Sequence, residues 1–296
     1  MYTVILLSVS IFFAVANNAI LHSLNNKGLR GIGDVLLFNA FVSLIWILIL
    51  SILNKGFNIS AVSWLWGIIY GSVTAAFLLC KMKAMSTGPA SVTSFIGCSS
   101  LLISTAFGLI YFNEKVTAVQ IIGVVLLITA LFLTTAKSGS LNSINAEKSW
   151  FIWCILFFLC SGTTGIIFKL HQSSTARGEV NQMMLAAAIT STALFFASSF
   201  FMKLKNKSDK WFLYISVKIA LFVVICGIVS CGYNRINITL SGMLPSIIFF
   251  PLFNGSVIFL TSLAAVAIFR EKITKCQTMG ISIGIIALLL ASAGGR

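Results

Sequence analysis

Residues 112–123 read Phe112-Asn113-Glu114-Lys115-Val116-Thr117-Ala118-Val119-Gln120-Ile121-Ile122-Gly123, and residues 269–280 read Phe269-Arg270-Glu271-Lys272-Ile273-Thr274-Lys275-Cys276-Gln277-Thr278-Met279-Gly280. Phe, Glu, Lys, Thr, Gln and Gly coincide in the two stretches at a constant offset of 157 residues (269 minus 112). Each stretch lies between two long apolar runs. The chain therefore reads as two copies of one multi-helix unit.

The composition indicates that lipid is the main solvent of this chain. Of its 296 residues, 58% are hydrophobic and only 9% are charged, whereas about 25% are charged in a soluble domain. The net charge is +14, but the basic residues lie mostly in short gaps between apolar runs. That placement favours loops held on the cytoplasmic side of a membrane over nucleic-acid binding. We expect a multi-pass integral protein of a bacterial plasma membrane.

Ten apolar runs are long enough to cross a bilayer as helices, which takes about 20 residues each. They are 2–23, 35–53, 62–84, 89–111, 117–136, 150–170, 180–202, 212–234, 245–268 and 275–293. Asp34 and Glu179 open the second run of each half, and Pro89 and Pro245 open the fourth. Since each half holds five spans, an odd number, the second half must enter the membrane in the opposite orientation.

The predicted fold class is therefore an all-α membrane protein with ten transmembrane helices in two inverted five-helix repeats. The first repeat covers residues 1–136, a linker covers 137–149, and the second repeat covers 150–296. Such an arrangement is typical of secondary transporters.

The repeated pattern Phe-x-Glu-Lys-x-Thr-x-x-Gln-x-x-Gly, followed by a final apolar span, resembles the EamA-type members of the drug/metabolite transporter superfamily. The resemblance covers the whole chain and is clearest over 85–136 and 240–293. It implies a ten-helix carrier that works by alternating access, with a central cavity between the halves. Relatives carry amino acids, sugars, nucleotide sugars, phosphorylated metabolites or drugs, so the motif says little about the substrate.

The ninth span holds the strongest candidate for a substrate contact. Pro251 removes a backbone N–H, Gly255 adds flexibility, and Asn254 brings a donor and an acceptor into the membrane. Gly97-Cys98 lies at the matching place in the fourth span, and interrupted spans at matching places indicate a binding site. The alternative is a kinked packing helix. Weaker candidates, which could equally join helices to one another, are Asn17, Asn18, Asn39, Ser94, Ser99, Tyr233 and Asn234.

Charged residues near the span ends allow two interpretations each. Glu114 and Glu271 could act in gating, or could cap helix ends and pair with Lys115 and Lys272. Four cations could extend to the membrane surface or form a basic cavity mouth that attracts an anion: Lys81, Lys83, Lys169 and Arg235. No acid lies at mid-span, which disfavours a carboxylate-centred cation or proton exchanger.

Catalysis is not expected, because no His, Asp or Glu lies at mid-span to serve as base, acid or metal ligand. The seven cysteines fall inside predicted spans, with Cys276 at the start of the last one, and form no CxxC pattern, which indicates packing. We expect no catalytic residues, no metal and no cofactor.

The predicted function is secondary active transport of a small polar organic metabolite by a monomer or weak dimer, with a coupling ion left open. The alternative is a membrane receptor that reuses the fold.

The side of the membrane that the termini face stays open. The connections after odd-numbered spans hold about twice as many Lys and Arg as the connections after even-numbered spans together with the C-terminus. Because the side richer in Lys and Arg faces the cytoplasm, this count places the termini outside it. The family resemblance implies termini inside.

Overall fold

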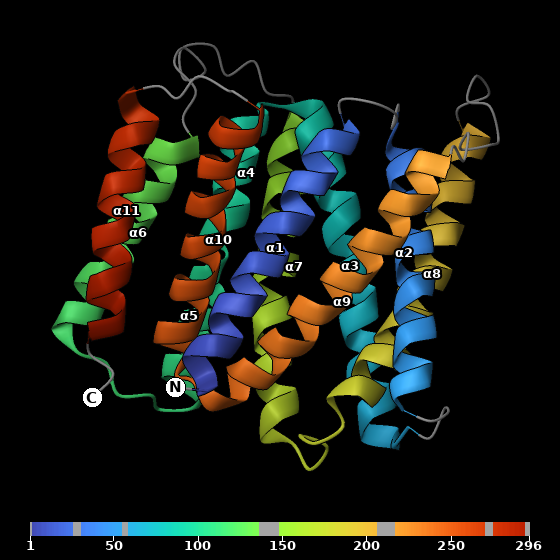
Figure 1. Ribbon diagram of the computed structural model, residues 1–296, viewed down its shortest axis with the longest axis horizontal. Helices are drawn as coiled ribbons and strands as arrows, with labels where there is room; N and C mark the ends of the chain where they lie inside the picture. The colour runs from blue at the N-terminus through green and yellow to red at the C-terminus, as the bar shows by residue number, and fades with distance from the viewer. Residues whose placement is uncertain are drawn as a thin grey trace.

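The structure is a computed structural model that describes residues 2–25, 31–54, 59–135, 148–205, 217–269 and 275–293. These residues form helices joined by short connections and contain no strand (Figure 1). The helices are α1 (Tyr2–Asn25), α2 (Ile32–Leu53), α3 (Ala61–Thr87), α4 (Ala90–Ser99), α5 (Leu101–Tyr111), α6 (Ala118–Thr135), α7 (Lys148–Ser173), α8 (Val180–Lys205), α9 (Val217–Met243), α10 (Ser246–Phe269) and α11 (Lys275–Ala293). The all-α prediction is confirmed.

Each predicted span corresponds to one helix except the fourth, which is divided into α4 and α5. By length and hydropathy, eight segments of the described chain can cross a membrane, counting Val92–Tyr111 across α4 and α5 as one. Two further apolar helices, over Ala118–Leu133 and Lys275–Ala291, are shorter. Large apolar side chains on the outer surface, such as Ile52 at 78% exposed and Ile110 at 80%, fit a surface that faces lipid.

The two halves of the chain interleave. α6 packs on α11, α2 packs on α8 and α9, and α3 packs on α7 and α8. α1 packs on α9 and α10, while α5 packs on α7 and α10. Figure 1 shows the helices standing side by side, with the start of α1 and the end of α11 at the same end of the molecule. We call this the terminal end. Because helices of one half pack mainly on helices of the other, the interior belongs to both halves.

Two glycines let α3 approach α8 closely. A Cβ atom on Gly67 would lie 2.7 Å from the Met183 carbonyl oxygen, and one on Gly71 would lie 2.5 Å from the Ala187 carbonyl oxygen. Both obstacles are backbone atoms, which cannot move aside as a flexible side chain can. Small residues at such positions are what close helix packing in a membrane requires.

Glu179 joins the starts of α3 and α8. Its carboxylate accepts hydrogen bonds from Ser60 Oγ at 2.5 Å and Ser63 Oγ at 2.6 Å. These two hydroxyl donors hold the pKa of Glu179 below its usual value, because they stabilise the charged form. The carboxylate also lies at the start of α8, where the helix dipole favours negative charge.

We predict that Gly71→Ala destabilises the protein, because the new methyl group must push α3 away from α8. Overpacking of this kind costs about 1–3 kcal/mol, which should lower the thermal unfolding midpoint by several degrees. Gly178→Ala is the matched control, since a Cβ there would meet nothing within 4 Å. Thermal unfolding of both variants in detergent checks this, and equal midpoints would contradict it.

We also predict a pH-dependent effect of Glu179→Gln. The pKa of Glu179 is lowered in the folded state, so its stabilising contribution is present above the unfolded pKa and is lost as the pH falls through the folded pKa. Wild type should therefore unfold at a higher temperature than the variant at neutral pH. The difference should shrink below the usual value of 4.5. A gap that stays constant down to acidic pH would show that this carboxylate is not the cause.

Candidate functional site

A cavity of about 430 Å³ lies in the middle of the helix bundle. Eight helices contribute to its wall, namely α1, α2, α3, α5, α7, α8, α9 and α10. Its polar and charged lining residues are Asn17, Asn18, Asn39, Ser43, Tyr70, Thr74, Lys81, Ser100, Ser104, Ser161, Thr164, Ser191, Ser230, Tyr233, Asn234, Asn237 and Asn254. The volume is that of an ordinary small-molecule site.

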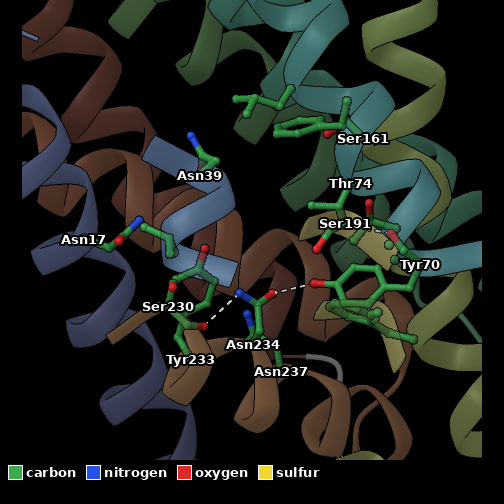
Figure 2. Close-up of a pocket in the computed structure, with 18 of the residues that line it drawn as sticks. Asn17, Asn39, Tyr70, Thr74, Ser161, Ser191, Ser230, Tyr233, Asn234 and Asn237 are labelled. Carbon is green, nitrogen blue, oxygen red and sulfur yellow. Dashed lines mark hydrogen bonds between the residues drawn. The ribbon is translucent and has the colours of Figure 1, made fainter. Parts of the chain in front are cut away.

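A chain of hydrogen bonds crosses one wall of the cavity (Figure 2). Tyr70 Oη donates to Asn234 Oδ1 at 3.0 Å, and Asn234 Nδ2 donates to the Ser230 carbonyl oxygen at 2.9 Å. Trp46 Nε1 donates to Ser230 Oγ at 2.8 Å. These bonds join α2, α3 and α9 and hold their polar groups in place before any ligand enters.

Asparagine side chains in the wall differ in how many of their groups are already bonded. Asn39 Nδ2 donates to the Val35 carbonyl oxygen and Asn254 Nδ2 to the Phe250 carbonyl oxygen, at 2.8 and 2.9 Å. Asn18 Nδ2 donates to Thr261 Oγ1 at 3.3 Å. Asn17 is 8% exposed, and its side chain makes no hydrogen bond within the described part of the chain. Its amide is therefore open to a ligand in the cavity.

The structure brings most of the expected contact residues together. Those that line the cavity are Asn17, Asn18, Asn39, Tyr233, Asn234 and Asn254. Ser94 and Ser99 lie outside the lining, and Ser99 Oγ donates to the Phe95 carbonyl oxygen of its own helix at 2.9 Å. α5 of the fourth span and α10 of the ninth span contact each other, and both contribute to the wall.

The four cations have different environments. Lys81 lines the cavity, with Nζ 6.0 Å from the centre of the Phe77 ring. Lys83 lies outside the lining. Arg235 is exposed, and its Nε donates to Asn181 Oδ1 at 2.6 Å. Lys169 pairs with Glu114 below the cavity. A ring of cations at a cavity mouth is therefore absent from the described residues, and Lys81 alone faces the interior space.

A helix break occurs in the fourth span, whereas the sequence analysis predicted the main irregularity in the ninth. α4 ends at Ser99, α5 begins at Leu101, and Ser100 Oγ lies 2.6 Å from both the Gly97 carbonyl oxygen and Ser161 Oγ. The bond to Ser161 joins the break in this span to α7. α10 continues through Pro251 without interruption, so Pro251 does not divide the ninth span.

Glu114 lies at the centre of a buried cluster at the terminal end. Its Oε1 accepts from Lys169 Nζ at 2.7 Å and from Ser246 Oγ at 3.1 Å, and its Oε2 accepts from the Ser246 backbone N–H at 2.6 Å. Lys169 Nζ also donates to the Leu244 carbonyl oxygen at 2.9 Å. The side chains of Lys169 and Glu114 are only 11% and 12% exposed. We call Glu114, Lys169, Leu244 and Ser246 the Glu114 cluster.

The contacts of the Glu114 cluster agree with the helix-end interpretation of this residue. The carboxylate caps the start of α10, as a helix-end interpretation requires. It also joins the connection after α5 to α7 and α10 of the other half. The predicted pairing of Glu114 with Lys115 was wrong, because Glu114 forms its ion pair with Lys169 from a distant part of the sequence. Glu271, the repeat counterpart, lies outside the described residues.

Several cavity residues were missed from the sequence, namely Tyr70, Thr74, Ser161, Ser191, Ser230 and Asn237. Ser and Thr can bond their own helix, so a single one carries little information. Helical spacing was the available signal, because Tyr70 and Thr74, or Asn234 and Asn237, lie on one face. Trp46 also lines the cavity and donates a hydrogen bond.

Neither Asp nor Glu is among the described residues that line the cavity. The described residues also contain no group of three or more His, Cys, Asp or Glu side chains that could hold a metal ion. The wall combines neutral polar groups, aromatic rings and one ammonium group.

Comparison with known proteins gives a family match to the first half of the chain and a fold match to the whole chain. The EamA-like transporter family matches residues 3–136. Among solved structures, 29 chains match. One crystal structure has a TM-score of 0.76 at 12% sequence identity, with 100% of this chain and 98% of the other covered. At that identity the likeness shows the fold alone. No curated protein matches the sequence.

We predict that Glu114→Gln and Lys169→Met each destabilise the protein, because each leaves the other charge buried without its partner. Such a loss costs about 3–5 kcal/mol. The double variant should be less destabilised than the sum of the two single variants, since no uncompensated charge remains. Thermal unfolding of the set in detergent measures this coupling. Arg235→Gln, at an exposed contact, is the control and should change little; additive effects of the two cluster variants would contradict the prediction.

Proposed function

Since the first half of this chain, residues 3–136, belongs to the EamA-like transporter family, we propose that the whole chain is a secondary active transporter of a small polar organic metabolite. The chain is a multi-pass membrane protein of the drug/metabolite transporter superfamily. The observation that carries the proposal is the central cavity, which lies between the two halves and presents neutral polar groups at the depth of the spans. Fixed polar groups in an apolar surrounding are what orients a ligand.

Helix packing supports an inverted-repeat architecture of ten spans. If each span of one half exchanges with its counterpart in the other, α6 exchanges with α11 and α2 with α8, and both pairs are in contact. The contact of α1 with α9 becomes the contact of α7 with α3, which is also present. This exchange of partners is what a two-fold relation between five-helix units requires.

Alternating access needs one end of the cavity to be closed while the other opens. The Glu114 cluster fastens the connection after α5 to α7 and α10 at the terminal end. Phe168 and Phe249, which line the cavity, lie one residue from Lys169 and three residues from Ser246. Release of the cluster would let the first half move relative to the second directly below the cavity. We propose that Glu114 acts in this way as a gating residue.

A receptor or interaction protein built on the same fold is the competing function. It would bind a ligand without carrying it, so ligand flux in proteoliposomes separates the two. Thermal-shift screening of the purified protein against a metabolite library would supply a compound for that measurement. Binding without flux would favour the receptor.

We predict that Asn254→Leu, which keeps similar bulk, lowers transport about tenfold or more. The substitution removes the amide oxygen that a ligand could bond, and an unsatisfied polar partner costs about 1–3 kcal/mol. Asn181→Leu is the matched control, because Asn181 bonds Arg235 outside the cavity. Both variants should express and remain monodisperse, and counterflow in proteoliposomes measures transport. Normal transport by Asn254→Leu would remove this residue from the site.

A further inference from the structure

The described part of the cavity wall carries positive charge but no negative charge. Among the described residues that line it, the wall has one cation, Lys81, and no Asp or Glu, and the other polar groups are neutral. We propose, resting on the proposed transport function, that the cavity takes a monocarboxylate and that Lys81 is its counter-ion. Four observations support this assignment of substrate class.

Lys81 lies inside a span and not at its end. It precedes the last residue of α3, Thr87, by six residues, which is more than one helical turn. α3 begins at the terminal end and finishes at the opposite one (Figure 1). Lys81 therefore faces the part of the cavity that is farthest from the Glu114 cluster.

Within the described residues, Lys81 has no ion pair and no hydrogen bond. The other buried lysine, Lys169, has both, to Glu114 and to the Leu244 carbonyl oxygen. The Phe77 ring lies 6.0 Å from the Lys81 ammonium group, the outer limit of a cation–π contact, and the Cys98 thiol is close enough to interact with it electrostatically. A charged group in the membrane interior is costly unless it has a partner, and such groups usually mark a substrate or ion pathway. A bound anion would supply the missing partner.

Charge balance selects a monoanion. One ammonium group compensates one negative charge, and the described lining contains no Arg that could hold a phosphate by two parallel hydrogen bonds. A phosphate monoester carries about −1.5 to −2 charges at neutral pH, so it would leave negative charge uncompensated in a low-dielectric site. An organic cation would meet Lys81 as a like charge and would find no acid in the wall.

The rest of the wall fits the body of such a substrate. Trp46, Phe77 and Phe249 offer aromatic surface to an apolar portion. Asn17 has an unbonded amide that can donate to a second carboxylate oxygen or bond a hydroxyl group. Asn39 and Asn254 use their N–H groups on their own helices, which leaves amide oxygens for a donor on the substrate.

Sets of ligands that share one skeleton and differ in charge test the proposal. The probes are para-hydroxyphenylacetate, its primary amide and tyramine; hexanoate, hexanamide and hexylamine; and phenyl phosphate. Thermal unfolding of the purified full chain in a neutral detergent is the readout. At about ten times its Kd, a binding carboxylate should raise the midpoint by about 2–4 °C, while the amide, amine and phosphate of the series should do so less.

Variants assign the effect to Lys81. Lys81→Met should weaken carboxylate binding about 30-fold or more, as expected when one partner of a buried charge pair is removed. Lys81→Arg keeps the charge and should retain part of the affinity. Lys83→Met, the same change two residues along α3 and outside the lining, should leave it unchanged. Without ligand, Lys81→Met should unfold no earlier than wild type, because the ammonium group has no partner to lose.

Three results would overturn the proposal. They are equal binding of carboxylates by Lys81→Met and wild type, stronger binding of the amines or of phenyl phosphate, and no shift of the wild-type protein by either carboxylate. Failure of the proposed transport function can be distinguished from failure of the proposed anion site. Carboxylates that bind through Lys81 without counterflow in proteoliposomes would refute transport and keep the anion site. Counterflow of a neutral compound that is unaffected by Lys81→Met would support transport and refute the anion site.

Discussion

Every backbone N–H and C=O group within a bilayer must find its partner inside the protein, and this constraint governs the whole structure. It dictates helices for all the spans, and it also governs the polar side chains. Asn39, Asn234 and Asn254 each donate to the carbonyl oxygen four residues earlier in their own helix. Thr74 does the same with Tyr70. These four side chains of the cavity wall are thus satisfied by their own helices, whereas Asn17 and Lys81 have no such partner within the described residues.

Charged groups follow the same constraint with two different outcomes. The Glu114 cluster satisfies an acid, a base, a helix start and a free carbonyl oxygen in one buried arrangement. It joins segments that lie 55 and 132 residues apart in the sequence. Lys81 has no such arrangement, although it also lies within a span. The Glu114–Lys169 pair, whose charges compensate each other, fits the proposed contact that closes one end of the cavity. Lys81, whose charge has no partner, fits the proposed anion site.

The duplicated sequence does not produce equal halves at the cavity. The fourth span is broken at Ser100, where a hydroxyl group bonds the backbone and reaches α7. The ninth span remains one helix in spite of Pro251. Proline leaves a carbonyl without its usual donor but does not remove the packing that holds α10 on α1, α5 and α11. The divided fourth span and the continuous ninth span both contribute to the cavity wall, so the two halves differ there.

Hydrophobicity, span length and the repeated Glu-Lys stretch were sufficient to predict an all-α membrane protein, its helices and its family, because these depend on short-range chemistry. Six of the eight expected contact residues line the cavity, since an amide in a span needs a polar surrounding. Lys81 and Lys83 show what the sequence could not decide. They are two residues apart on one helix and so point to different faces. Only the packing of α3 against its neighbours turns Lys81 toward the cavity, just as only the tertiary fold brings Lys169 and Ser246 to Glu114.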